Sequence, residues 1–209
     1  MSPRGGLRRF LEAPQPVVAE PDEKCEMCAT PVGQRHGHVV DLENRSILCA
    51  CRACFLLFTR PEAGGGRFRA VPERVLYDPA RPLTPPEWQR LGIPVSSVFF
   101  LRSATGLSAF YPSPAGATEC LLDLDVWAEL AAAHPLLGAA AEDVEAIVIR
   151  DGGDAGVECF LVPVDACYQL VGTVRIHWKG FDGGQEAHER IEEFYSGLRG
   201  AARLFEPEA

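Results

Sequence analysis

Apolar residues in the second half of the chain follow the spacing of strands and helices. Segments that are rich in β-branched and aromatic residues predict strands, two of them joined by a short turn into a hairpin. Strands are predicted at residues 95–102, 107–111, 119–122, 144–150 and 157–162. Segments with helical apolar spacing and polar starts predict helices. Helices are predicted at residues 123–133, 165–178 and 185–203. Grouped strands with helices after them indicate an α+β fold, a mostly antiparallel sheet covered by helices.

The pattern changes in the first half of the chain, where shorter segments are set between cysteines. Residues 36–42 and 46–50 alternate as two strands of a hairpin, and Glu43-Asn44-Arg45 is a plausible turn between them. Residues 52–59 have helical character and stop before Pro61. We therefore expect a knuckle, a hairpin and a helix in succession, which is a treble-clef-like arrangement.

These segments predict four parts in the chain. Residues 1–24 form an N-terminal arm, 25–60 a zinc-binding knuckle-hairpin-helix module, 61–94 a linker and 95–209 an α+β domain. The linker is predicted from its prolines and from Gly64-Gly65-Gly66. Within it, Val75-Leu76-Tyr77 and Trp88 have the character of residues that pack on a neighbouring surface.

Two cysteine pairs carry the strongest chemical signal. Cys25 and Cys28 are separated by two residues, and Cys51 and Cys54 repeat that spacing after the predicted hairpin. This spacing lets both sulfurs of a pair reach one ion, and four thiolates satisfy the tetrahedral preference of Zn²⁺. The sequence therefore predicts one structural zinc site.

The exact ligand set stays open at this point. Cys49 lies two residues before Cys51 and could replace it, while His36 or His38 could supply a fourth ligand or bond to one. Four thiolates can also hold iron, so an iron-thiolate redox carrier is an alternative.

Composition and charge narrow the class of protein. The chain has 209 residues and a formal net charge of −9, whereas a general nucleic-acid binder needs excess Lys and Arg. No apolar run approaches the roughly 20 residues of a membrane span. We expect a cytoplasmic protein, in which eight cysteines serve as metal ligands or buried thiols and not as disulfides.

A catalytic site is not indicated by any motif, and we expect no catalytic residues. Cys159 or Cys167 with His134, His177 or His188 could be read as a nucleophile and a base, but chance co-occurrence explains such pairs. An enzyme with a pocket in residues 95–209 is retained as a second alternative.

Several motifs together resemble an uncharacterised bacterial family, a domain of unknown function, over almost the whole chain. They are Cys25-Glu26-Met27-Cys28, His36-Gly37-His38-Val39-Val40-Asp41, Leu48-Cys49-Ala50-Cys51-Arg52-Ala53-Cys54, and residues 111–119 and 167–180. Members of that family tend to be encoded near NiFe-hydrogenase structural and maturation genes. The resemblance implies an accessory role in hydrogenase assembly or maturation, and it implies no catalytic residues.

The sequence thus predicts a zinc-binding accessory protein that acts by protein–protein contact. Its expected partner, implied by the resemblance, is a hydrogenase subunit or maturation factor.

Overall fold

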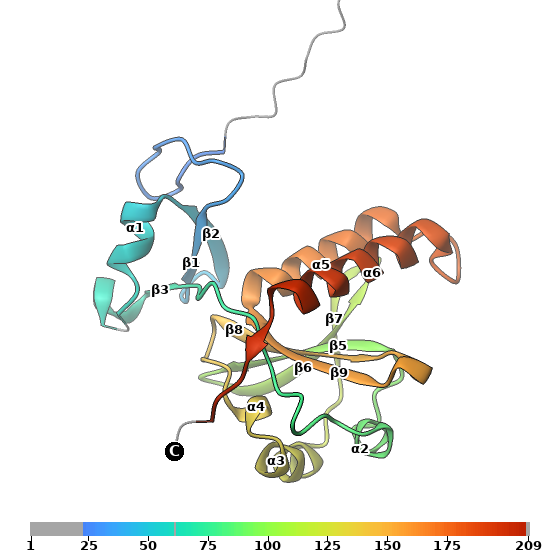
Figure 1. Cartoon of the computed structure of the whole chain (residues 1–209). Helices are drawn as coiled ribbons and strands as arrows, with labels where there is room; N and C mark the ends of the chain where they lie inside the picture. The colour runs from blue at the N-terminus through green and yellow to red at the C-terminus, as the bar shows by residue number, and fades with distance from the viewer. Residues whose placement is uncertain (1–22, 61, 208–209) are drawn as a thin grey trace, which may run out of the picture.

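Two sheets organise the chain, a small one near the N-terminus and a large one covered by helices (Figure 1). The structure is a computed structural model that describes residues 23–60 and 62–207. The predicted N-terminal arm therefore lies almost entirely outside the described residues. No described helix combines the length and apolar character needed to cross a membrane.

The strands are β1 Gly37–Asp41, β2 Ser46–Ala50, β3 Phe68–Ala70, β4 Leu76–Tyr77, β5 Ser97–Ser103, β6 Gly106–Ser113, β7 Gly116–Cys120, β8 Glu145–Asp151, β9 Val157–Pro163 and β10 Arg203–Leu204. The α-helices are α1 Arg52–Leu57, α2 Pro85–Arg90, α3 Leu124–Ala133, α4 Pro135–Gly138, α5 Val164–His177 and α6 Gly184–Ala201. Two short 3₁₀ turns are η2 Ala63–Gly66 and η3 Gly153–Ala155.

The small sheet has the order β2-β1-β3, and both of its strand pairs are antiparallel. Its tight turn after β1 is held by Asp41, whose carboxylate accepts bonds from the backbone of Glu43 and Asn44. The Arg67 side chain, just before β3, donates to both Asp41 oxygens at 3.0 and 2.6 Å. The Arg67 guanidinium holds the pKa of Asp41 well below its usual range. We call residues 23–60 and 62–70, which contain this sheet and α1, the hairpin module.

The large sheet has the order β10-β4-β9-β8-β5-β6-β7, and all its pairs are antiparallel except β10 with β4. Helices α5 and α6 cover one face, and α2, α3 and α4 lie on the other (Figure 1). The central strand β8 contributes side chains to the cores on both faces of the sheet, because strand side chains alternate between faces. Ile147 and Ile149 pack with Trp127 of α3, whereas Ala146 and Val148 pack with Leu170 of α5.

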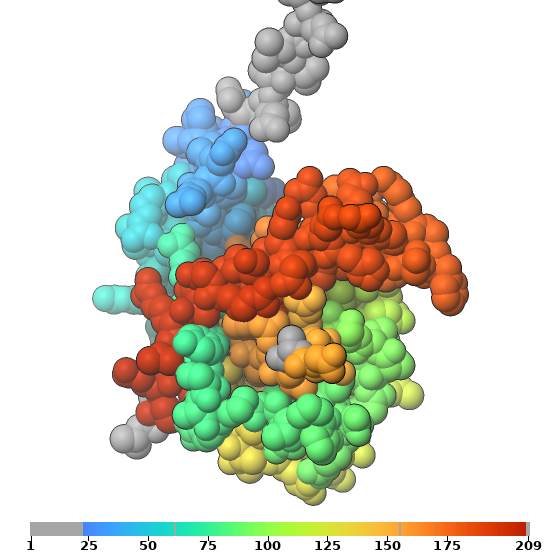
Figure 2. Space-filling model, turned by 45° about the vertical axis from the view of Figure 1, so that its right-hand side comes forward, coloured from blue at the N-terminus to red at the C-terminus, as the bar shows by residue number. Residues whose placement is uncertain are grey.

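The hairpin module forms a lobe beside the helix-covered sheet (Figure 2). An apolar cluster joins the two, with Val40 of β1 packed among Val71, Val144 and Val164. The chain between β3 and β4 is held by the fully buried Glu145 at the start of β8. Its carboxylate accepts from the Arg74 guanidinium at 2.6 and 2.8 Å.

The α+β fold with a mostly antiparallel sheet covered by helices is confirmed. The predicted hairpin over residues 36–50 is present as β1 and β2, with α1 directly after it. Residues 61–94, predicted as a linker, also contribute β3 to the small sheet and β4 and α2 to the larger unit. Trp88 of α2 is buried there. The division into domains stays a prediction.

Replacing Arg74 with Met should lower the free energy of unfolding by roughly 3 kcal/mol, because it leaves the buried Glu145 carboxylate without its ion-pair partner. Urea denaturation of the whole chain measures this. The control is Arg90→Met, which removes an exposed pair with Glu129 and should cost under about 1 kcal/mol. Equal effects of the two substitutions would show that the Arg74 guanidinium does not stabilise the buried carboxylate.

Candidate metal centre

The first cysteine pair lies in a tight turn before β1. Cys25 donates its N–H to the Thr30 carbonyl at 2.9 Å and accepts from the Ala29 N–H at 2.8 Å. Ala29 adopts a φ of 60°, a left-handed conformation that bends the chain back after Cys28. The turn is tied to β2 by the Glu26 N–H, which donates to the Cys49 carbonyl at 2.9 Å. The knuckle therefore sits directly over the end of the hairpin.

The second pair lies where β2 passes into α1. Cys51 is the residue before the helix, and Cys54 lies in its first turn. The helix is held against the hairpin by Phe55, which is buried with Val39 and Ala50. Phe55 lies so close to β1 that an added Cβ at Gly37 would come within 2.5 Å of its ring. Because Gly37 has no side chain, α1 can bring its cysteines up to the knuckle.

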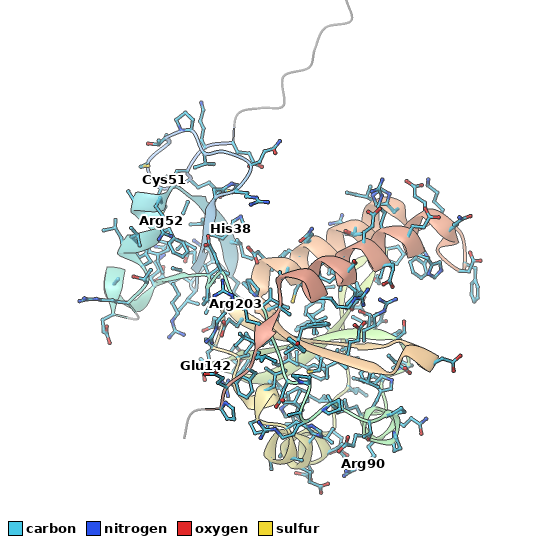
Figure 3. The ribbon with its side chains drawn as sticks, in the orientation of Figure 1. His38, Cys51, Arg52, Arg90, Glu142 and Arg203 are labelled. Atoms are coloured by element: carbon cyan, nitrogen blue, oxygen red, sulfur yellow. The ribbon has the colours of Figure 1, made fainter. Side chains whose placement is uncertain are left out.

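The four sulfurs of Cys25, Cys28, Cys51 and Cys54 converge, with every pair within 4.8 Å. The sulfurs of Cys28 and Cys51 are 3.6 Å apart, close to the roughly 3.8 Å between thiolates bound to one tetrahedral zinc. Cys25 is buried, Cys28 is exposed and the other two are intermediate. Cys51 lies at the top of α1, under the knuckle (Figure 3). The group can hold a metal ion.

The pKa values of the thiols differ because their hydrogen-bond partners differ. Burial raises the pKa of Cys25, but N–H groups of Cys51, Met27 and Cys28 outweigh it and lower that pKa to about 6. The Thr30 side chain and backbone lower the pKa of Cys28. The neighbouring Cys28 sulfur, with burial, raises the pKa of Cys54 to about 12. Four thiolates this close repel one another, so a cation between them is the natural way to keep all four ionised.

The three alternative ligands form a second cluster of their own. One ring nitrogen each of His36 and His38 and the sulfur of Cys49 lie within 4.8 Å of one another. They belong to a group separate from the four cysteines. The structure thus places Cys49, His36 and His38 in a group apart from the four cysteines, and the set of residues that binds metal stays a prediction.

The remaining histidines make bonds that hold the fold together. His134 bonds the Arg81 carbonyl and the Glu87 carboxylate, each at 3.0 Å. His177 bonds Glu186 at 3.0 Å, and His188 bonds the Asp182 carbonyl at 2.8 Å.

The remaining thiols are held by the core of the larger unit. Burial raises the pKa of Cys159 to about 12 and raises that of Cys167 further. Such pKa values suit thiols that stay protonated and not nucleophiles.

One family model matches residues 24–202, and its description reads "Family of unknown function (DUF5947)". The chain belongs to this family. The match includes every residue of the two clusters, so both lie within the part of the chain that defines DUF5947. No curated protein and no solved structure shows significant similarity to the chain. The predicted resemblance to an uncharacterised family is confirmed, and the hydrogenase context of the family stays a prediction.

Sequence reasoning missed two carboxylates at the site. Asp165 is the first residue of the helix predicted over residues 165–178, and its Oδ2 lies 2.7 Å from Nδ1 of His38. Glu26 accepts the Cys49 N–H at 2.6 Å. Glu26 lies inside the first cysteine motif, which is a local signal. Asp165 is 127 residues from His38 in sequence, and no local pattern could pair them.

Replacing Gly37 with Ala should displace Phe55 and α1, and with them Cys51 and Cys54. We expect the affinity for metal to fall at least tenfold, since a misfit of about 1 Å separates the two cysteine pairs. Competition with a chromophoric chelator measures this affinity. Gly33→Ala is the control, because a Cβ there meets nothing within 4 Å and should leave affinity unchanged. Unchanged affinity in Gly37→Ala would contradict this role of the close contact.

Proposed function

We propose that Cys25, Cys28, Cys51 and Cys54 bind one structural Zn²⁺ that folds the hairpin module. The observation that carries this proposal is the convergence of four sulfurs from two separate turns within 4.8 Å. A site with four protein thiolates is closed, with no position left for water or substrate, and such zinc sites are structural.

The size of the hairpin module supports a structural role for the ion. Its own apolar cluster contains three buried residues, Val39, Ala50 and Phe55. A core of that size contributes little to stability by itself. Binding of structural zinc contributes apparent free energies of roughly 10–16 kcal/mol at neutral pH, which is enough to hold such a unit.

Iron is the alternative occupant of the same four thiolates. The donor set alone fits both metals, since rubredoxin-type iron and structural zinc use the same ligands. Zinc is preferred because nothing else in the sequence suggests electron transfer. Purified protein that is colourless and holds zinc supports the proposal, and thiolate-to-iron absorption in the visible range would overturn it.

Cys28→Ser should remove one equivalent of zinc per chain. Elemental analysis after competition with a chelator measures the loss, and hydrogen exchange should show residues 25–60 loosened while residues 95–209 stay protected. The control is Cys120→Ser, which changes a thiol on β7 outside both clusters and should keep the full metal content. Full metal content in Cys28→Ser would contradict the four-cysteine site.

The module is proposed to act by contact with a protein partner. Leu56 and Leu57 of α1 are 51% and 65% exposed, although they follow directly on the cysteine pair. Zinc would fix this helix, and its two leucines would then be presented on a rigid element. The partner implied by the family resemblance is a hydrogenase subunit or maturation factor, which makes this chain an accessory protein of hydrogenase assembly in the cytoplasm.

The double variant Leu56→Ser, Leu57→Ser should abolish copurification with a hydrogenase subunit from cells that express that hydrogenase. Loss of anchoring apolar contacts costs more than about 1.4 kcal/mol, or about tenfold in affinity. Its zinc content should be unchanged. Leu121→Ser, at a residue 97% exposed after β7, is the control. Absence of any hydrogenase subunit with the wild-type protein would contradict the accessory role and leave the zinc site standing.

A further inference from the structure

The cluster of His36, His38 and Cys49 lies on one face of the β1–β2 hairpin. His38 and Cys49 are directly opposite each other in the strand register. His36 precedes His38 by two residues, and side chains two apart in an extended chain lie on the same side. The rings of His36 and His38 have their centroids 4.9 Å apart. His38 lies on the side of the hairpin that faces α5 (Figure 3).

His36 contains a buried nitrogen with no partner. Its side chain is 8% exposed, and its Nε2 atom is buried without a hydrogen bond. Its other nitrogen, Nδ1, lies 2.8 Å from the Gly33 carbonyl and 3.6 Å from a Glu23 oxygen. Because a carbonyl can only accept, Nδ1 carries the proton, and in the neutral ring the lone pair lies on Nε2. A buried acceptor with no donor is costly, and a metal ion would satisfy it.

His38 also makes its hydrogen bond through Nδ1. Its Nδ1 lies 2.7 Å from Oδ2 of Asp165, the second residue of α5. In the neutral ring Nδ1–H donates to this carboxylate, and the lone pair lies on Nε2. Histidines that bind metals commonly donate their other N–H to a carboxylate or a backbone carbonyl, which fixes the ring and makes it a better ligand. The partner of His36 is a backbone carbonyl, and the partner of His38 is a carboxylate.

We propose that His36 Nε2, His38 Nε2 and Cys49 Sγ form a second metal site for a divalent transition cation such as Zn²⁺. Two imidazoles and a thiolate are borderline donors that suit such a cation. One ring nitrogen of each histidine and the Cys49 sulfur lie within 4.8 Å of one another, so closing on an ion at bond lengths of about 2.0–2.3 Å needs small movements of these side chains.

Three protein ligands leave a fourth position for water or another small ligand, unlike the closed four-cysteine site. The second site is therefore the one at which the metal can exchange, or at which a small ligand can bind to the metal. Asp165 belongs to α5, whereas the three ligands belong to the hairpin module. Asp165 is a positioning residue, and through it the occupied site depends on how the module sits against the larger unit.

The test is a titration of metal-stripped full-length protein with Co²⁺ under reducing, anaerobic conditions. Wild type should bind two equivalents, and the thiolate-to-cobalt absorption reports on each. His36→Gln and Cys49→Ser should each bind one equivalent, with the strong absorption of the four-thiolate centre retained. That retained absorption shows that the module is still folded. His188→Gln, at a histidine on α6 outside both clusters, should bind two.

The outcomes separate this site from the four-cysteine site. If wild type binds one equivalent that Cys28→Ser removes and His36→Gln keeps, the second site is overturned and the zinc proposal stands. If the single equivalent is lost in His36→Gln and Cys49→Ser but kept in Cys28→Ser, the second site stands and the zinc proposal is overturned. If wild type binds no Co²⁺, both are overturned.

Asp165→Ala should weaken Co²⁺ binding at the second site by 10–100-fold, the usual effect of removing such a partner. Asp165→Asn keeps an oxygen that accepts the His38 N–H, so it should recover much of the affinity. Equal affinities in Asp165→Ala and wild type would overturn the positioning role.

Discussion

Closure of the chain around four sulfurs is the constraint on which the hairpin module depends. Two turns that are far apart in sequence must meet, and three contacts bring them together. The Glu26 N–H donates to the Cys49 carbonyl of β2, and the Phe55 side chain of α1 packs against Gly37. The antiparallel register of β1 and β2 places the end of β2 beneath the knuckle. None of these contacts is strong alone. Mutual repulsion of four thiolates opposes them until a cation lies between the sulfurs.

The module and the larger unit depend on each other through different chemistry. Val40 of the module packs in an apolar cluster with the larger unit, and His38 of the module bonds Asp165 of α5. The chain that leads from the module to β4 is held by the ion pair of Arg74 with the buried Glu145. A buried carboxylate is tolerable only with a fixed cation, and a buried histidine nitrogen only with a donor or a metal. The interface therefore contains polar groups whose partners must be in place, which favours a single arrangement of the two units.

The sequence predicted those features that local pattern determines. Apolar alternation predicted β5, β6, β8 and β9, and the cysteine spacing predicted the converging sulfurs. The short strands β3, β4 and β10 were not predicted, because two or three residues carry too little periodicity and form strands only against a neighbour. The separation of Cys49, His36 and His38 from the four cysteines was also beyond the sequence, since it depends on which face of the hairpin each side chain takes.

X-ray absorption at the metal edge identifies the ion bound by the four cysteines, when it is measured on Cys49→Ser protein purified with the metal it acquires in cells. This variant keeps the four-cysteine centre as its metal site. We expect a zinc edge and a first shell of sulfur alone at about 2.3 Å. An iron edge, or a shell dominated by nitrogen and oxygen at about 2.0 Å, would contradict it.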